Sequence, residues 1–157
     1  MLDYLVGQQA HKVSAKGATL GLRMSANSTI EATDPPWLAA LGETINQLIC
    51  LPQNWDGEGG LPVPFDAAMA LLSFLLSNLV HEMPAPTATP LSRGGVALEW
   101  HLMGRTLELY FGESEPAAYF YADENGQESE GEIAPELLVV KSLLGKLASN
   151  GKRRVSR

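Results

Sequence analysis

The strongest constraint in this sequence is an alternation of apolar and polar residues that starts at Val96 and ends near Ile133. Every second residue from Val96 to Leu102 is a large apolar one, and the same alternation returns from Thr106 to Phe111. A period of two sends successive side chains to opposite faces of a β-strand. We therefore predict strands that each have one buried face and one solvated face, joined by short turns.

The first two strands are separated by Gly104-Arg105, which predicts a two-residue type II′ turn because glycine accepts the positive φ of its first central position. This turn sets His101 opposite Glu108. A turn one residue earlier, at Met103-Gly104, would instead set Glu99 opposite Glu108, and two like charges facing each other cost stability. We therefore predict the register that opposes His101 to Glu108.

A second hairpin is indicated by Asn125-Gly126, since both residues tolerate the positive φ of a type I′ turn. With this loop, Tyr121 lies opposite Glu130 and Tyr119 lies opposite Glu132 on the solvated face. The residues assigned to the buried face of this hairpin are Ala118, Phe120 and Ile133.

We predict an α+β fold in which a four-stranded antiparallel β-meander has its helices packed mainly on one face, in the order ααββββα. Two helices are expected before the strands, over residues 34–51 and 64–83, and one after them, from residue 134. Asp34 is the expected N-cap of the first helix. The second helix is apolar nearly all round and is expected to be buried centrally, and the prolines between 84 and 90 predict an extended link.

The chain divides into three parts. Residues 1–33 show no sustained period and are expected to form a loosely ordered N-terminal arm. Residues 34–150 are expected to form a single α+β domain, and residues 151–157 a basic C-terminal tail.

Charge is distributed unevenly along the chain. The net charge is −7, but residues 24–140 carry 17 acidic side chains and two basic ones, whereas residues 141–157 carry six basic side chains and no acidic one. An acidic body repels phosphate groups, so we expect no nucleic acid on it. The same charge favours a basic protein partner.

The cellular compartment is inferred from the cysteine content and from the apolar runs. Cys50 is the single cysteine, expected as a buried thiol at a helix end, so no internal disulfide can form. No apolar run is long enough to span a bilayer, and the N-terminus lacks the pattern of a signal peptide. We therefore expect a cytoplasmic protein that does not meet a membrane.

The solvated face of the predicted sheet is acidic and bears three tyrosines. Its residues are Glu99, His101, Glu108, Tyr110, Tyr119, Tyr121, Glu130 and Glu132. One interpretation is an ordinary solvated face, since tyrosine has a high strand propensity. The other is a partner-binding face. Our functional hypothesis follows the second: a non-enzymatic protein-interaction module that binds a basic protein, by analogy with antitoxins or immunity proteins.

A small hydrolase or metal-binding enzyme is the alternative, with Glu99, His101 and Glu108 as its candidate catalytic residues. A carboxylate beside an imidazole can orient the ring or raise its pKa. However, an open sheet face excludes no water, and one histidine falls short of the ligands that zinc usually takes. We therefore expect no catalytic residue, no metal and no cofactor. If the strand over residues 94–103 lies at the sheet edge, it could pair with the same strand of a second copy and form a homodimer.

A glycine-rich loop follows the first helix and contains Trp55, Asp56, Gly57 and Gly59. It lacks the lysine of a phosphate-binding loop, and its acidic residues would repel phosphate. We predict a structural loop in which Asp56 accepts backbone N–H bonds and caps the turn, while the indole of Trp55 anchors the loop.

Three motifs connect this loop with the first strand: Asn54-Trp55-Asp56-Gly57-Glu58-Gly59, Pro62-Val63 and Gly94-Gly95-Val96-Ala97-Leu98-Glu99-Trp100. In these motifs the chain resembles a family of small bacterial proteins of unassigned function, over residues 51–144. The resemblance implies a shared fold, and it implies no reaction and no functional residue.

Overall fold

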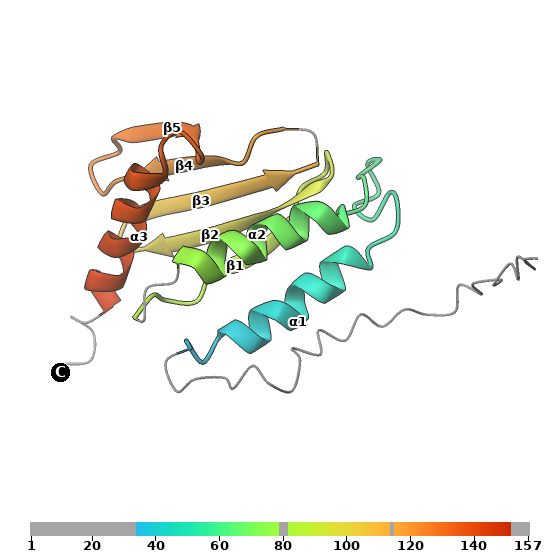
Figure 1. Cartoon of the computed structure of the whole chain (residues 1–157). Helices are drawn as coiled ribbons and strands as arrows, with labels where there is room; N and C mark the ends of the chain where they lie inside the picture. Colours follow the sequence, from blue (N-terminus) through green and yellow to red (C-terminus); the bar gives the residue numbers. More distant parts are fainter. Residues whose placement is uncertain (1–33, 79–81, 114, 152–157) are drawn as a thin grey trace, which may run out of the picture.

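The structure is a computed structural model, and it describes residues 34–78, 82–113 and 115–151. The predicted arm of residues 1–33 and residues 152–157 of the predicted basic tail lie outside the described residues, whereas Gly151 is the last residue of α3. The elements follow one another as α1 (Leu38–Ile49), α2 (Phe65–Asn78), β1 (Thr87–Pro90), β2 (Gly95–Leu102), β3 (Arg105–Gly112), β4 (Ala118–Ala122), β5 (Glu128–Glu132) and α3 (Leu137–Gly151) (Figure 1).

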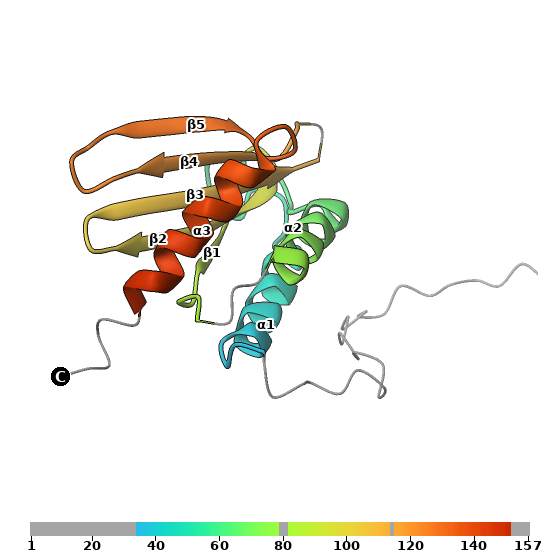
Figure 2. The same cartoon turned by 60° about the vertical axis from the view of Figure 1, so that its left-hand side comes forward.

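The five strands form one antiparallel sheet in the order β1-β2-β3-β4-β5, in which each strand pairs with its neighbour in the chain. All three helices lie on the same face of this sheet (Figure 2). The α+β class and the antiparallel meander are therefore confirmed. The predicted count of four strands is wrong, because residues 87–90 form a further strand.

The additional strand β1 lies where the sequence predicts an extended proline-rich link. Pro90 pairs with Val96 at the edge of the sheet, and an edge is where a strand tolerates a residue without an N–H. Two indoles, the half-buried one of Trp37 and the buried one of Trp100, hold the preceding segment: Trp37 Nε1 donates to Met83 O at 2.8 Å, and Trp100 Nε1 donates to Pro84 O at 2.9 Å. These bonds hold the proline-rich link close to the sheet. They join residues far apart in the sequence, so a local pattern does not reveal them.

The turn between β2 and β3 differs from the predicted one. Met103 and Gly104 have φ of 52° and 79°, and Leu102 pairs with Arg105. Positive φ at both central residues is typical of a type I′ turn, whose twist matches that of the flanking strands. Glu99 consequently lies opposite Glu108, in the register that charge repulsion disfavours. The predicted pairing of His101 with Glu108 is wrong.

The turn between β4 and β5 has three residues, Glu124 to Gly126, where a two-residue loop is predicted. Gly126 has a φ of 76° and its N–H donates to Asp123 O at 3.0 Å, as in a type I turn followed by a left-handed glycine. The carboxylate of Asp123 accepts the N–H groups of Asn125 at 2.8 Å and Gln127 at 2.9 Å. The extra loop residue shifts the register by one position.

This shift changes which residues of β4 share a face with the glutamates of β5. Phe120 pairs with Glu130, and Tyr119 pairs with Gly131. A change of one residue in register moves every side chain of a strand to the other face relative to its partner. Tyr119 and Tyr121 pair with the buried residues Leu109 and Leu107 of β3 and are themselves buried, at 3% and 8% exposure, although they are predicted on the solvated face. Phe120, predicted in the core, lies on the opposite face.

The core lies between the sheet and the three helices. Its largest fully buried side chains are Ile45 from α1, Leu71 and Leu75 from α2, Val96, Leu98 and Trp100 from β2, Leu107 and Leu109 from β3, and Val140, Leu144 and Leu147 from α3. The expected inward sides of β2 and β3 are confirmed. Among the described residues, no helix has the length and apolar character needed to cross a membrane.

Three local expectations about the helices are wrong. α1 begins after Trp37 and has no side-chain cap, so Asp34 does not fill the N-cap position. α2 is not central, because Met69 and Leu76 on its outer side are 37% and 52% exposed. Cys50 is exposed rather than buried, since α1 ends at the surface of the molecule.

The observed turn at Met103 can be tested by substitution. A residue other than glycine pays about 1 kcal/mol or more in the left-handed region, and asparagine tolerates it better than methionine. The side chain of Met103 is 73% exposed, so its loss costs little packing. We expect Met103→Asn to raise the free energy of unfolding by about 0.5 kcal/mol in urea denaturation. Met103→Ala is the control and should give no such gain. With a turn at Gly104-Arg105, residue 103 would be a strand residue and asparagine would instead lower stability.

Candidate functional site

The face of the sheet opposite the helices is not covered by any helix of the described part of the chain (Figure 2). We call this surface the open face. Strand register places on it Thr87 and Thr89 of β1, Glu99 and His101 of β2, Thr106, Glu108 and Tyr110 of β3, Ala118, Phe120 and Ala122 of β4, and Glu128, Glu130 and Glu132 of β5.

The open face contains most of the residues that the sequence assigns to partner binding. Those present are Glu99, His101, Glu108, Tyr110, Glu130 and Glu132. Tyr119 and Tyr121 are not on it, because they pair with Leu109 and Leu107 of β3 and share the buried face of those residues. Phe120 and Glu128 take part instead, and neither was a candidate. A signal for the pairing of Phe120 with Glu130 lay in the loop, because Asp123 followed by Asn125-Gly126 also suits a three-residue turn.

A chain of hydrogen bonds crosses three strands at one end of the open face. Thr89 Oγ1 donates to Glu99 Oε1 at 2.5 Å, and His101 Nε2 lies 3.3 Å from Glu99 Oε2. The second ring nitrogen of His101, Nδ1, lies 3.1 Å from Thr106 Oγ1. Both nitrogens of the imidazole therefore already have partners within the sheet. The arrangement orients His101, whose side chain is 57% exposed, but it turns neither nitrogen toward a bound substrate.

Glu108 lies opposite Glu99 and is bonded to its neighbour along the strand, since the hydroxyl of Tyr110 donates to its carboxylate. Burial raises the pKa of the Tyr110 phenol above its ordinary value, and the hydrogen bond to Glu108 and the charges of Glu99 and Glu130 raise it further. The phenol is protonated at neutral pH, as an ordinary tyrosine is, and the raised pKa extends this range further into alkaline pH. It serves as a hydrogen-bond donor and as an apolar ring surface.

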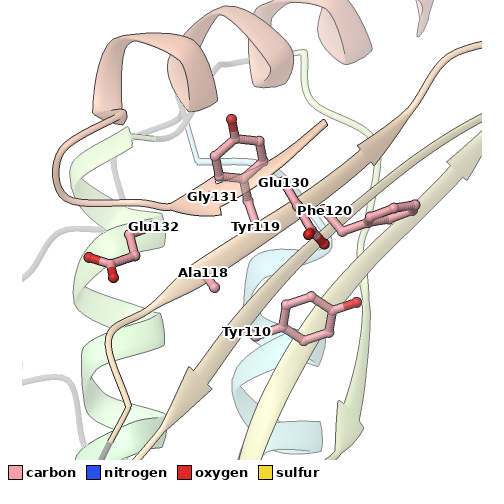
Figure 3. A pocket seen from close by; sticks show the side chains of 7 residues that line it. All are labelled: Tyr110, Ala118, Tyr119, Phe120, Glu130, Gly131 and Glu132. Carbon is pink, nitrogen blue, oxygen red and sulfur yellow. The ribbon is translucent and has the colours of Figure 1, made fainter. Parts of the chain in front are cut away.

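A shallow hollow lies on the open face where β3, β4 and β5 meet (Figure 3). The rings of Tyr110 and Phe120 and the carboxylates of Glu130 and Glu132 surround it, and the small residue Ala118 leaves room between them. Figure 3 shows the Glu130 carboxylate close to both rings. An aromatic and acidic lining of this kind can accept the head and the apolar stem of a lysine or arginine side chain.

Strand β5 is held from the opposite side by the start of α3. The hydroxyl of Tyr119 donates to Glu136 Oε2 at 2.5 Å, and this bond is the largest cause of the raised pKa of Tyr119. The Glu136 side chain also lies over Gly131, where a Cβ atom would come within 2.8 Å of Glu136 Oε1. The close approach of Glu136 thus requires a glycine at position 131, and the pairing of β5 with β4 places its glutamates on the open face.

Asp56 organises the glycine-rich loop, which lies away from the open face. Its Oδ1 atom accepts the N–H groups of Glu58 at 2.9 Å and Gly60 at 2.8 Å, and Oδ2 accepts the hydroxyl of Ser92 at 2.9 Å. The two backbone bonds are the main causes that hold the pKa of Asp56 below its usual value. The carboxylate closes the loop on itself and ties it to the turn between β1 and β2.

The other loop residues complete this closure. Trp55 Nε1 donates to Leu61 O at 3.0 Å, and Gly57 and Gly59 have φ of 78° and 94°, which only glycine adopts readily. Gly60, to which sequence reasoning gives no role, lies so close to Asp56 that a Cβ atom would fall 2.7 Å from its Oδ2 atom. The loop therefore has a structural role in the positions that the structure describes.

Metal binding has little geometric support. Within the ranges 34–78, 82–113 and 115–151, no group of three or more His, Cys, Asp or Glu side chains is arranged to hold a metal ion. Glu99, His101 and Glu108 share the open face without forming such a group.

Comparisons with known proteins add no identification: no family model matches the chain, and no curated protein or solved structure matches it either. The resemblance in the Asn54–Gly59 and Gly94–Trp100 motifs stays a prediction.

The role of Asp56 leads to a pH-dependent expectation. A carboxyl group whose pKa is lowered in the folded state contributes stability above its unfolded pKa, here 3.8, and loses it as the pH falls through the folded value. Asp56→Asn should lower the free energy of unfolding at pH 7. The difference in this free energy between the variant and the wild type should shrink below about pH 4.

Urea denaturation between about pH 7 and pH 3 measures this difference. Glu58→Gln is the matched control, because Glu58 is exposed in the same loop and only its backbone N–H bonds to Asp56. A difference between Asp56→Asn and wild type that stays constant down to pH 3 would contradict the role of the charged carboxylate.

Proposed function

We propose that this chain is a non-enzymatic protein-interaction module whose open face binds a basic protein partner. The observation that carries the proposal is the composition of this face: Glu99, Glu108, Glu128, Glu130 and Glu132 lie on it, and no lysine or arginine of the described strands does. Opposite potentials on two surfaces steer association and select partners.

The aromatic residues of the open face support binding rather than simple solvation. Tyr110 and Phe120 are half-buried on a face that no helix of the described residues covers, with carboxylates on either side. Aromatic anchors surrounded by polar groups are typical of the energetic centre of a protein interface. A lysine or arginine side chain can lay its methylenes on these rings and direct its charge toward Glu130 or Glu132.

The shape of the surface favours a macromolecule over a small substrate. The hollow beside Tyr110 is shallow, and the two nitrogens of His101 are bonded to Glu99 and Thr106. Small-molecule sites are usually concave and exclude water, whereas protein interfaces are broad and flatter. An antitoxin or immunity-type role, in which an acidic surface neutralises a basic protein, is one activity consistent with this proposal.

The alternative is a small hydrolase or metal-binding enzyme built on Glu99, His101 and Glu108. It is supported by the 3.3 Å contact between His101 and Glu99. The engaged imidazole nitrogens and the exposed position of His101 weigh against proton transfer to a substrate. We therefore favour binding of a protein partner over the enzyme alternative.

The proposal is tested by reversing charge on the open face. Glu108→Lys combined with Glu130→Lys should reduce capture of a basic protein from a lysate of the source organism by about tenfold or more, since two favourable charge contacts become repulsive. Capture by the wild type should also weaken between about 50 mM and about 500 mM salt. The readout is quantitative mass spectrometry together with cross-links that map the contacted residues.

Glu43→Lys combined with Glu58→Lys is the matched control, with the same change of charge at exposed positions outside the sheet. This control should capture the same protein as the wild type, and thermal melts should show that both variants are folded. Equal capture by wild type and both variants, or cross-links confined to the helices, would refute the open face as the binding surface.

A further inference from the structure

Strand β5 lies at one edge of the sheet and carries the sequence Glu128-Ser129-Glu130-Gly131-Glu132. On one side it pairs with β4, and on its other side no strand of the described part of the chain pairs with it. Four of its five residues are exposed, and Gly131 is half-buried. An edge of this kind presents backbone N–H and C=O groups that another strand can bind.

The register shows which backbone groups face outward. Ile133 N donates to Ala117 O at 2.8 Å and Asp123 N donates to Gln127 O at 2.9 Å, so these two pairs are hydrogen-bonded across β4 and β5. Hydrogen-bonded and non-bonded pairs alternate in an antiparallel ladder. Odd-numbered residues of β5 therefore bond to β4. The backbone groups of the even-numbered residues, Glu128, Glu130 and Glu132, point away from the sheet.

The same three residues direct their side chains to the open face, because they pair with Ala122, Phe120 and Ala118. Each outward-facing pair of N–H and C=O groups thus comes with a carboxylate beside it. In an antiparallel strand added at this edge, the residues directly opposite the glutamates would also face the open side of the sheet. Opposite-charge pairs at such positions stabilise strand pairing, and like-charge pairs destabilise it.

This arrangement discriminates between partners. A second copy of β5 would set glutamates against glutamates, which disfavours self-association at this edge. The opposite edge of the sheet is β1, which ends in Pro90. The sequence predicts β2 at an edge where two copies could pair, but β2 is an inner strand between β1 and β3. A strand with basic residues at alternate positions meets the acidic edge with complementary charge.

The edge is also held in place before a partner arrives. Glu136 lies over Gly131 on the inner side, and Asp123 accepts two N–H bonds in the preceding loop. A strand that is already extended loses little conformational freedom when it binds. Main-chain hydrogen bonds would then give affinity and the alternate side chains would give specificity, as in other cases of strand addition.

We propose that the partner adds an antiparallel strand to the outer edge of β5, with a lysine or arginine at every second position, opposite Glu128, Glu130 and Glu132. This inference rests on the proposed function, because it assumes that the open face receives a basic protein. It adds the mode of docking and the sequence pattern of the partner.

The test uses the full chain and two seven-residue peptides that alternate arginine with threonine. In one peptide the arginine backbone nitrogens are methylated, and in the other the threonine backbone nitrogens are methylated. The two have the same charge and composition. In the proposed geometry the arginine N–H groups bond to β5 and the threonine N–H groups face away from it. Methylation at arginine should therefore weaken binding by about tenfold or more relative to methylation at threonine.

Hydrogen exchange of the chain, measured by NMR, gives a second readout. The threonine-methylated peptide should slow exchange of the amide protons of Glu128, Glu130 and Glu132, which have no partner in β4 in the observed register. Glu108→Lys combined with Glu130→Lys should abolish binding of both peptides, and the Glu43→Lys, Glu58→Lys control should preserve it.

The outcomes separate the two proposals. If both peptides bind equally, lose affinity in the charge-reversed variant and protect none of the three amides, the open face binds basic partners by charge alone and strand addition is overturned. If neither peptide binds, strand addition is also overturned, and the capture experiment decides the proposed function. If both bind the charge-reversed variant as well as the wild type, both proposals fail.

Discussion

The carboxylate of Asp123 accepts the N–H groups of Asn125 and Gln127, and the rest of the sheet surface depends on the loop that these bonds close. A three-residue loop gives β5 a register that differs by one position from that of a two-residue loop. Because side chains alternate with a period of two, that one position decides the face of every residue in β4 relative to β5. Since β4 pairs with β3 so that Phe120 lies opposite Glu108, this position brings Glu130 to the open face beside Phe120.

A second turn shows how local geometry can outweigh a repulsive pair. The type I′ turn at Met103-Gly104 sets Glu99 opposite Glu108, and directly opposed like charges cost up to about 1 kcal/mol. The hydroxyl of Thr89 donates to Glu99, and that of Tyr110 donates to Glu108. Hydrogen bonds to charged groups contribute about 1.5–3 kcal/mol each, so these donors offset the repulsion.

The open face and the outer edge of β5 form one continuous acidic surface, because the glutamates of β5 belong to both. Its aromatic part, Tyr110 and Phe120, lies in the middle of that surface beside Glu130. The helices bury the opposite side of the sheet and leave this side to solvent or to a partner (Figure 2). An open surface of single sign with only a shallow hollow suits recognition of a basic protein more than chemistry on a small molecule.

The sequence by itself determined the α+β class, the meander, the inward sides of β2 and β3 and the acidic character of the solvated face, because these follow from hydrophobic period and charge count. Only the tertiary structure decided the registers, the strand β1 and the positions of Tyr119 and Phe120. Turn length at Asp123 depends on side-chain-to-backbone hydrogen bonds, and β1 depends on indole bonds from Trp37 and Trp100. Contacts of this kind join atoms that a periodic pattern does not relate.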